Sequence, residues 1–465
     1  MIDLTNFNNC KIGIFGLGKT GVDSLNAFLT KNTQIFAWDD NKENILRIKK
    51  TINKDKDKDK DKNIHFSNVI DPFDVKKLDF VIVSPGVPNR YPTLHKIFSI
   101  CERYKIPIIT DIDILFKACP VANYIGVTGT NGKSTTASLI YHILSANNYK
   151  SALGGNIGTP VLSLPHFNSA TEHYVIELSS YQLDLMSNYK FNIASLLSIT
   201  PDHLDRYETF EDYKNAKTKI FHNQNENDFA VISLNNEVNR AIFKELKLIN
   251  KQKIIPVSSK EALEGGISVI NDKIYDNYFE HKIFNLKVPN SLIGSHNAEN
   301  IAIAYAAARA LKIEPVNIVN SLNSFIGLTH RMELFFQTSN LTFINDSKAT
   351  NIASCKEALD SFKDIYWIAG GIFKEKSTNE LGNHLKEVRH CYLVGKDADK
   401  FMQILEENKI PYSTSKTIEN ALSEIRDTVK NGTILLSPCC SSFDQWKNFE
   451  ERGERFKSLV SDMFL

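Results

Sequence analysis

The segment from residue 129 to residue 135 constrains this chain more than any other part of its sequence. An apolar stretch at 124–128 precedes it, as expected for a buried strand, and a helical stretch at 133–147 follows. In such a loop, backbone N–H groups wrap the phosphates of a nucleotide, a lysine neutralises charge and a serine hydroxyl ligates Mg²⁺. We therefore predict ATP or GTP binding by Gly129, Thr130, Asn131, Gly132, Lys133, Ser134 and Thr135. The strict Walker pattern asks for glycine at Val127, so a chance Gly-Lys-Ser at a helix start is the alternative.

Two further alternations of strands and helices flank this loop. Residues 11–15 and 34–38 form apolar runs around a helical stretch, and 80–83 adds another run of the buried-strand type. A later alternation runs from Phe343 through 365–369, 391–394 and 433–436. The 465 residues suit about three domains at roughly 150 residues each. We predict an α/β chain with a Rossmann-like domain at 1–111, a P-loop ATPase-like domain with a parallel sheet at 112–327, and a second Rossmann-like domain at 328–465.

Composition excludes several classes of protein. Lys plus Arg is 55 and Asp plus Glu is 54, so the net charge of +1 argues against nucleic-acid or membrane-surface binding, which need a field of one sign. The longest apolar stretches, such as 301–311, fall short of the ~20 residues that span a bilayer. The seven cysteines lack framework spacing, and no basic segment followed by an apolar one begins the chain. We expect a cytoplasmic protein with reduced thiols, and a solvated loop at the Lys-Asp alternation of 54–62.

A second glycine motif follows the first strand. Gly16, Gly18 and Gly21 have the spacing that lets a backbone approach a pyrophosphate, and Asp39 and Asp40 stand about 20 residues further on, where an acid can bond a ribose hydroxyl. The alternative is a tight turn that merely needs glycine. The motif leaves the identity of the nucleotide open.

Acidic and basic residues downstream of the phosphate loop are candidates for chemistry. Glu177 and His203 each follow a predicted strand, where ligands of open α/β sheets gather, and both side-chain types can hold Mg²⁺ together with phosphates. A loop hydrogen bond is the alternative for His203. Lys217 lies on a predicted helix from Phe210, where a solvated charge is the ordinary interpretation, and Asn156 lies in a turn-rich loop.

The last third holds polar loops at strand ends. They are residues 345–351, Lys374 after a Gly-Gly pair, and 437–449. Small hydroxyls and lysines suit the capture of carboxylate or phosphate, yet residue chemistry alone leaves an ordinary loop equally open.

Together these motifs resemble the ATP-dependent Mur ligases of peptidoglycan synthesis. The resemblance rests on Gly-Thr-Asn-Gly-Lys-Ser-Thr at 129–135, Glu-Leu-Ser-Ser at 177–180, Asp-His-Leu-Asp-Arg at 202–206, His296-Asn297-x-x-Asn300 and Arg331. Three segments, at 155–158, 345–351 and 437–449, resemble the members of that family that add D-glutamate. The motifs cover essentially the whole chain in the expected order.

The resemblance implies a substrate for each domain. The first domain would bind the UDP end of UDP-N-acetylmuramoyl-L-alanine through Gly16, Gly18, Lys19, Thr20, Asp39, Ser84, Gly86 and Asn156. ATP would lie between the central and C-terminal domains, held by the 129–135 loop with Asn297, Asn300, Arg331, Asp346 and Lys348. D-Glutamate would be bound by His203, Thr350, Lys374, Ser442 and Phe449. Lys376 is a rival for Lys374, because an acidic or small residue is expected just before that lysine and Phe373 stands there.

The resemblance also implies cofactors and a reaction. Two Mg²⁺ ions would be held through Ser134, Glu177, His203 and Lys217, the last as a carbamylated lysine. The alanyl carboxylate would attack the γ-phosphate of ATP, giving an acyl phosphate that the D-glutamate amine attacks in turn. Lys133, Asn156, His203 and Lys217 are the implied catalytic residues, and closure of the C-terminal domain would exclude water.

Other functions fit less of the sequence. A sister ligase that adds another amino acid, or one that elongates folate with glutamate, would share the ATP chemistry but differ at 345–351. A nicotinamide-dependent dehydrogenase would explain Gly16 to Gly21 but not the phosphate loop, and a non-catalytic nucleotide switch would not need the substrate-side lysines. We expect a monomer, because no long heptad run is legible.

Overall fold

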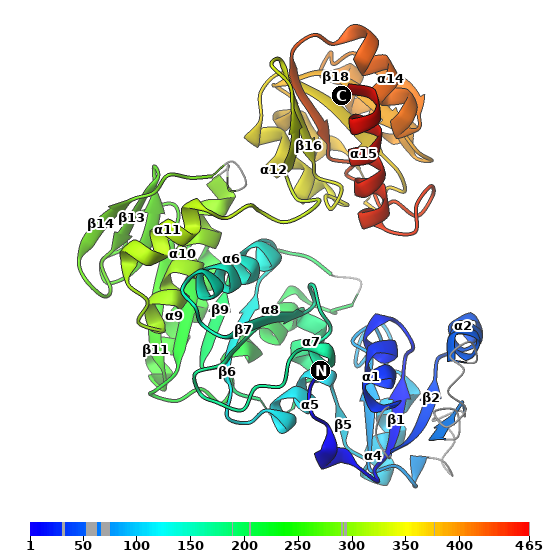
Figure 1. The fold of residues 1–465 in the computed structure, drawn as a ribbon, viewed down its shortest axis with the longest axis vertical. Coiled ribbons are helices and arrows are strands. Elements are labelled where there is room, and N and C mark those ends of the chain that lie inside the picture. Colours follow the sequence, from blue (N-terminus) through cyan, green and yellow to red (C-terminus); the bar gives the residue numbers. More distant parts are fainter. Residues whose placement is uncertain are drawn as a thin grey trace. The chain divides into compact units, whose positions relative to one another are not determined.

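The computed structural model describes residues 1–29, 33–52, 63–66, 75–187, 189–203, 206–289, 292, 295–375 and 377–464. The predicted loop at 54–62, Asp205, the side chain of His296 and Lys376 lie outside the described residues. The chain forms two compact units, residues 1–286 with 299–321, and residues 287–298 with 322–465 (Figure 1). Three sheets organise the described residues, two in the first unit and one in the second.

The first sheet has five parallel strands in the order β3-β2-β1-β4-β5. The strands are β1 (Lys11–Phe15), β2 (Gln34–Trp38), β3 (Ile64–His65), β4 (Phe80–Val83) and β5 (Ile108–Ile109), and the helices are α1 (Lys19–Leu29), α2 (Lys42–Ile52) and α4 (Lys96–Tyr104). The apolar runs predicted at 11–15, 34–38 and 80–83 are therefore strands, as continuous hydrophobic runs in parallel sheets usually are.

The second sheet has nine strands in the order β14-β13-β12-β11-β10-β9-β6-β8-β7. They are β6 (Asn123–Thr128), β7 (Ser151–Gly155), β8 (His173–Glu177), β9 (Ile193–Leu196), β10 (Phe229–Ser233), β11 (Lys253–Ser258), β12 (Ile267–Ile270), β13 (Lys273–Asp276) and β14 (Lys282–Asn285). The strands from β12 to β7 are parallel, whereas β13 is antiparallel to both of its neighbours. The sheet is therefore mixed and not wholly parallel as predicted, because Asn271 and Asp272 (φ 48° and 57°) close a two-residue hairpin.

The helices of this region include the one that follows the phosphate loop. They are α5 (Asp111–Ala118), α6 (Lys133–Ala146), α7 (Ser180–Leu185), α8 (Phe210–Thr218), α9 (Glu237–Ile249), α10 (Ser295–Ala310) and α11 (Pro315–Asn323). The predicted Ala-rich helix corresponds to α10, which is buried on all sides between Asn300 and Ala308. A helix that is apolar all round is expected in a core of this kind.

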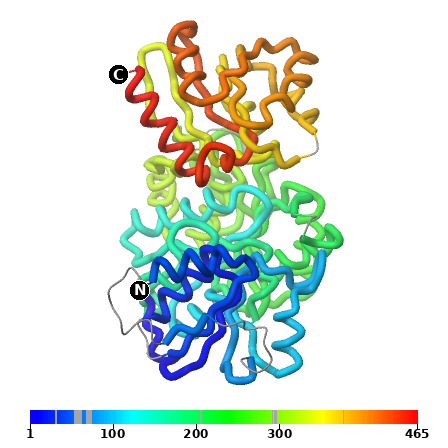
Figure 2. The backbone as a smooth tube through the Cα atoms, turned by 90° about the vertical axis from the view of Figure 1, so that its right-hand side faces the viewer, coloured from blue at the N-terminus to red at the C-terminus, as the bar shows by residue number. Residues whose placement is uncertain are grey.

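The third sheet, in the second unit, has the order β15-β16-β20-β17-β18-β19. Its strands are β15 (Glu333–Gln337), β16 (Leu341–Asn345), β17 (Ile365–Gly370), β18 (Val388–Val394), β19 (Tyr412–Lys416) and β20 (Gly432–Leu436), and only β15 is antiparallel to its neighbour. One face packs against α14 (Ile418–Thr428) and α15 (Phe449–Phe464), which lie side by side, and the other against α12 (Ile352–Ser361) and α13 (Met402–Glu407). Figure 2 shows the two helix layers of this unit.

Within the part of the chain that the structure describes, no helix is both long enough and apolar enough to cross a membrane.

Candidate active site

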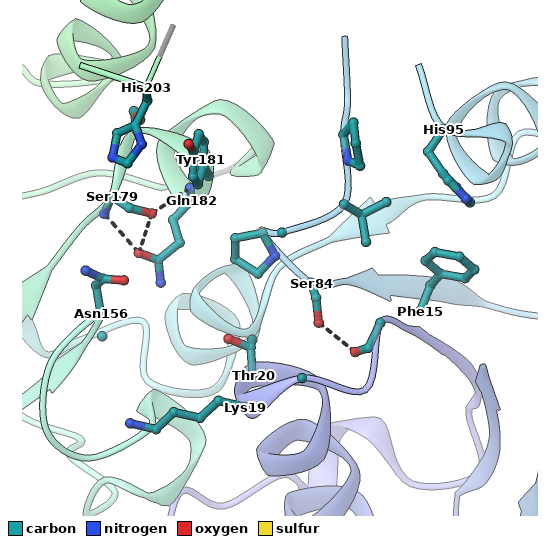
Figure 3. A pocket seen from close by; sticks show the side chains of 18 of the residues that line it. Phe15, Lys19, Thr20, Ser84, His95, Asn156, Ser179, Tyr181, Gln182 and His203 are labelled. Atoms are coloured by element: carbon teal, nitrogen blue, oxygen red, sulfur yellow. Dashed lines mark hydrogen bonds between the residues drawn. The ribbon is translucent and has the colours of Figure 1, made fainter. Parts of the chain in front are cut away.

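A cavity of about 700 Å³ opens in the first unit, between loops of the first two sheets. Figure 3 shows Lys19 and Thr20 of α1 on one side, and Asn156, Gln182 and His203 of the central region on the other. The lining includes every residue predicted to contact the UDP substrate: Gly16, Gly18, Lys19, Thr20, Asp39, Ser84, Gly86 and Asn156. It also includes the other predicted catalytic residues, Lys133, His203 and Lys217. One cavity therefore brings the residues predicted for the UDP substrate, from Gly16 to Asn156, together with those predicted for catalysis, from Lys133 to Lys217.

The glycine turn after β1 forms one wall of this cavity. Gly21 packs so closely that a Cβ there would collide with the carbonyl oxygen of Gly16, and Ser84 Oγ donates to that oxygen at 2.6 Å. Asp39 accepts hydrogen bonds from the backbone N–H of Leu17 at 2.6 Å and from Asn44 Nδ2 at 3.1 Å. The carboxylate of Asp39 therefore shapes the turn itself.

Asp40 and His95 lie on the same wall, and the sequence analysis did not single out His95. Asp40 Oδ2 is 2.9 Å from His95 Nε2, while His95 Nδ1 accepts from the backbone N–H of Ile97 at 3.2 Å. An accepting Nδ1 identifies the tautomer with hydrogen on Nε2, so His95 donates to Asp40. Helix capping by His95 Nδ1 holds the ring against Phe15, with ring centroids 4.7 Å apart.

The phosphate loop leads from β6 into the N-terminus of α6. Gly132 is the N-cap with φ 79°, and a Cβ there would collide with Asn300 Oδ1 and lie 2.8 Å from Leu197 Cδ2. Lys133 Nζ donates to the carbonyl oxygens of Gly129 at 3.1 Å and Thr130 at 2.6 Å. Backbone N–H groups at a helix N-terminus, together with this ammonium group, form a site for anions such as phosphates.

Lys217 on α8 is buried beside the same loop. Its side chain is among the largest that are fully buried, its Nζ donates to the Gly129 carbonyl oxygen at 2.7 Å, and it lies 4.7 Å from the Tyr213 ring centroid. Burial first, and then the charge of Lys133, lower the pKa of Lys217 well below its ordinary value of 10.5. The interpretation of Lys217 as a solvated charge is therefore wrong. A lysine of this kind is readily available as a neutral amine.

Glu177 ends β8 close to the loop and is 1% exposed. Asn156 Nδ2 donates to its Oε1 at 3.0 Å, whereas Oε2 is buried without a hydrogen-bond partner among the described residues. A buried carboxylate oxygen left in this way fits a divalent cation, since Mg²⁺ prefers oxygen ligands.

No group of three His, Cys, Asp or Glu side chains in the described ranges could hold a metal ion. Only two of the four predicted metal ligands, Glu177 and His203, are of these residue types. The remaining ligands would have to come from the Ser134 hydroxyl, a modified Lys217 and the phosphates of a bound nucleotide.

The sequence analysis also missed residues that hold the cavity wall between Ser179 and Arg206. Ser179 and Gln182 form a capping box at the start of α7, a pattern that the sequence carries openly (Figure 3). Arg206 lies over the Tyr181 ring at 4.7 Å and its Nη1 donates to the Gly86 carbonyl oxygen at 2.8 Å. These contacts tie the predicted substrate turn at Gly86 to the loop that carries His203.

Polar loops gather at the carboxyl ends of neighbouring strands in the third sheet, in the second unit. The strands β16, β20 and β17 are parallel neighbours, so the loops that follow them lie at the same end of the sheet. Asp346 accepts from Ser437 Oγ at 2.8 Å, and burial raises the pKa of this carboxyl to about 7. Lys348 Nζ lies 5.8 Å from the Phe449 ring centroid, and Lys374 Nζ lies 5.7 Å from that of Phe443.

The predicted binding sets are divided between the two units. Of the D-glutamate set, Thr350, Lys374, Ser442 and Phe449 belong to the second unit and His203 to the first. Of the ATP set, residues 129–135 and Asn300 belong to the first unit, and Asn297, Arg331, Asp346 and Lys348 to the second. The roles of these residues stay predictions.

Two family models match the chain. The Mur ligase middle domain matches residues 127–308, and the Mur ligase, glutamate ligase domain matches residues 330–440.

Curated relatives match along nearly the whole length. The chain is 40% identical over 462 residues to a UDP-N-acetylmuramoylalanine–D-glutamate ligase of Rickettsia bellii, covering 98% of each chain. It is 37% identical over 473 residues to the ligase of the same name from Rhodospirillum rubrum, covering 100% of this chain and 97% of the relative.

Solved structures share the fold at low sequence identity. A UDP-N-acetylmuramate-alanine ligase from Thermotoga maritima superposes with a TM-score of 0.61 at 16% identity, covering 98% of this chain and 100% of that one. A MurF ligase from the same organism, in complex with ADP, superposes with a TM-score of 0.57 at 17% identity, covering 84% and 90%.

Proposed function

This chain belongs to the Mur ligase family, and we propose that it adds D-glutamate to UDP-N-acetylmuramoyl-L-alanine with conversion of ATP to ADP and phosphate. The observation that carries the proposal is the 40% identity to a ligase of that name over 98% of both chains. The cavity supports it, since all eight residues predicted to contact the UDP substrate line one space together with Lys133 and Lys217. A volume of about 700 Å³ is of the size that holds a large small-molecule ligand.

The first stage forms an acyl phosphate. The alanyl carboxylate attacks the γ-phosphorus of ATP, the bond to the bridging oxygen breaks, and ADP leaves. Lys133 would exchange its bonds to the Gly129 and Thr130 carbonyl oxygens for phosphate oxygens, and the N–H groups that begin α6 would bind the charge that spreads in the transition state.

The second stage forms the amide. The D-glutamate amine attacks the acyl carbon, and a tetrahedral intermediate forms. The bond between that carbon and the bridging oxygen then breaks, phosphate leaves with this oxygen, and the amine loses a proton. We assign the binding of D-glutamate to Thr350, Lys374, Ser442 and the backbone of Phe449, with His203, because four of these five residues gather at the strand ends of the second unit. Closure of the C-terminal domain over the acyl phosphate would exclude water, which would otherwise hydrolyse this intermediate.

Two Mg²⁺ ions are part of the proposal. Glu177 fits one of them through its buried, unpartnered Oε2, and Ser134, His203 and a carbamylated Lys217 complete the protein ligands. Bound Mg²⁺ would neutralise phosphate charge. The carbamate would arise when the neutral Lys217 amine bonds to CO₂ and loses a proton, and burial of this lysine favours the neutral amine that the step needs.

We further propose that the enzyme works as a monomer on small-molecule substrates in the cytoplasm. All seven cysteines are free thiols, in keeping with a reducing compartment. Sedimentation of the purified chain tests the oligomeric state, and a dimer at enzyme concentrations used in assays would contradict it.

Product analysis tests the function. The protein is incubated with ATP, Mg²⁺, D-glutamate and UDP-N-acetylmuramoyl-L-alanine labelled with ¹⁸O in its carboxylate. The proposal predicts a UDP product enlarged by one glutamyl residue and one ¹⁸O atom in the released phosphate. A product without glutamate, or phosphate without label, would contradict it.

A further inference from the structure

Arg452 is a buried arginine that the proposed mechanism does not use. It lies on the first turn of α15, and the residue is 2% exposed. Its guanidinium group donates four hydrogen bonds. Nε reaches Ser347 Oγ at 2.9 Å, Nη2 reaches the Ser347 carbonyl oxygen at 2.8 Å, and both Nη1 and Nη2 reach the Cys440 carbonyl oxygen at 3.1 Å.

These two partners belong to the two loops that the proposed function assigns to different ligands. Ser347 stands between Asp346 and Lys348, in the loop after β16 that we assign to ATP. Cys440 stands two residues before Ser442, in the loop after β20 that we assign to D-glutamate. Residues Asn345 and Leu436, which end the two strands, are aligned in the sheet. The guanidinium group thus bridges the loops directly after the strands end.

A further bond closes this network. Ser347 Oγ accepts from Arg452 and donates its single hydrogen to the carbonyl oxygen of Phe449 at 2.8 Å. Phe449 is the residue whose backbone we assign to D-glutamate. One side chain therefore organises both sides of the predicted amino-acid site and the neighbouring nucleotide loop.

Burying the charge of Arg452 costs free energy of folding, so stability alone does not account for an arginine at this position. All four hydrogen bonds end on neutral oxygen atoms, and burial lowers the pKa of Arg452 to about 10, so the group stays charged at neutral pH. An apolar side chain of similar volume usually fills a core at lower cost than a buried charge. Only a planar guanidinium presents donors along several fixed directions, which a lysine ammonium does not reproduce.

We propose that Arg452 is a positioning residue that holds the loops after β16 and β20 as one platform, so that binding of ATP and binding of D-glutamate depend on the same guanidinium group. The inference rests on the proposed function. Because both loops lose their geometry when the bridge is removed, the KM values of both substrates should rise together, and kcat should fall less.

The test compares four variants in the phosphate-release assay of the full-length protein. Arg452→Met keeps much of the volume, Arg452→Lys keeps the charge, and Ser347→Ala removes the hydroxyl that joins Arg452 to Phe449. The matched control is Arg455→Met, on the same helix, where the side chain is 43% exposed and its nearest carboxylate is 3.8 Å away. Thermal unfolding of each variant is measured in parallel.

We expect Arg452→Met to raise both KM values by about tenfold to a hundredfold, the range for lost hydrogen bonds to a charged group. Arg452→Lys should not restore them, Ser347→Ala should shift both in the same direction by less, and Arg455→Met should leave them unchanged. Unchanged KM values in Arg452→Met, a change in only one of them, or full restoration by lysine would overturn the inference.

Two outcomes separate this inference from other failures. If Arg452→Met does not fold, Ser347→Ala decides, and unchanged KM values in that variant overturn the inference. If the wild-type protein uses another amino acid in place of D-glutamate, the proposed substrate is wrong, and the same comparison is made with the amino acid that it uses.

Discussion

Lys217 and Lys133 donate hydrogen bonds to the same acceptor, the carbonyl oxygen of Gly129, at 2.7 and 3.1 Å. Burial first, and then repulsion by the ammonium group of Lys133, lower the pKa of Lys217 well below its ordinary value. A carbamate on Lys217 would reverse the sign of this interaction, because the anion attracts Lys133. The shared acceptor therefore places Lys217, or its carbamate, directly beside the lysine of the phosphate loop.

Replacing Lys217 tests this explanation. Lys217→Ala should lower kcat by about a hundredfold or more, as loss of a charge-stabilising group does. Added formate or acetate should restore part of the activity, since a small carboxylate can occupy the place of the carbamate. Lys214→Ala is the control on the same helix, where Lys214 pairs with exposed Glu211 at 2.6 Å, and it should stay active. Equal losses in both variants, or no rescue by carboxylates, would count against the carbamate.

Glu177 provides a test of the metal site. Glu177→Gln removes the charge of a carboxylate whose Oε2 is buried without a partner among the described residues. The Mg²⁺ concentration for half-maximal activity should rise by about tenfold or more, the size of effect seen when a group that orients a metal site is lost. Titration of Mg²⁺ against phosphate release measures it. Glu226→Gln, an exposed site, is the control, and an unshifted Mg²⁺ curve in Glu177→Gln would remove Glu177 from the metal site.

A pair of glycines separates collision from backbone strain. Gly132 and Gly265 both have positive φ, 79° and 73°, but a Cβ at Gly132 would collide with Asn300 Oδ1, whereas a Cβ at Gly265 would meet nothing within 4 Å. Gly265→Ala should cost about 1–2 kcal/mol of stability through strain alone. Gly132→Ala should cost more and also weaken ATP binding measured by calorimetry. Unchanged ATP affinity in Gly132→Ala would show that the loop tolerates the displacement.

Asp111 predicts a pH dependence of stability. Burial raises the pKa of this carboxyl from 3.8 to about 7. Between these pH values the folded chain holds a proton that the unfolded chain has lost, so the free energy of unfolding should fall as pH rises through this window. Asp111→Asn, which imitates the protonated form, should therefore be more stable than wild type at pH 8 by up to a few kcal/mol, since one pKa unit corresponds to about 1.4 kcal/mol.

Denaturant unfolding at pH 4 and pH 8 checks that prediction. The two proteins should differ little at pH 4, where Asp111 is protonated in the folded chain and still about half protonated in the unfolded chain. Asp427→Asn is the control, because the Asp427 side chain is 66% exposed. A wild-type protein as stable at pH 8 as Asp111→Asn would contradict the buried-charge explanation.

Several residues that line the cavity directly follow strands that the sequence pattern predicts. Residues after β1, β4, β6 and β7 stand at the carboxyl ends of parallel strands, where the loops of an α/β sheet gather. Gly16, Ser84, Lys133 and Asn156 hold such positions, whereas their assignment to particular ligands came from the resemblance to a known family and stays a prediction.

Other features depend on contacts that no local pattern announces. His95 meets Asp40 across 55 positions, and Arg452 reaches Ser347 across 105. The antiparallel hairpin of β12 and β13 depends on positive φ angles at Asn271 and Asp272. Asparagine and aspartate are equally common in ordinary loops, so the sequence alone did not reveal the hairpin. The burial of Lys217 follows from the packing of α8 against the phosphate loop, and helical periodicity does not reveal it.

The most direct test of the proposed function is phosphate release from ATP in the presence of Mg²⁺ and UDP-N-acetylmuramoyl-L-alanine, with D-glutamate, L-glutamate, L-alanine or meso-diaminopimelate added in turn. Release that depends on D-glutamate alone is the predicted result. Release with one of the other amino acids in its place would assign the chain to a different ligase of the same family, and no release with any of the four from folded protein would contradict the catalytic account.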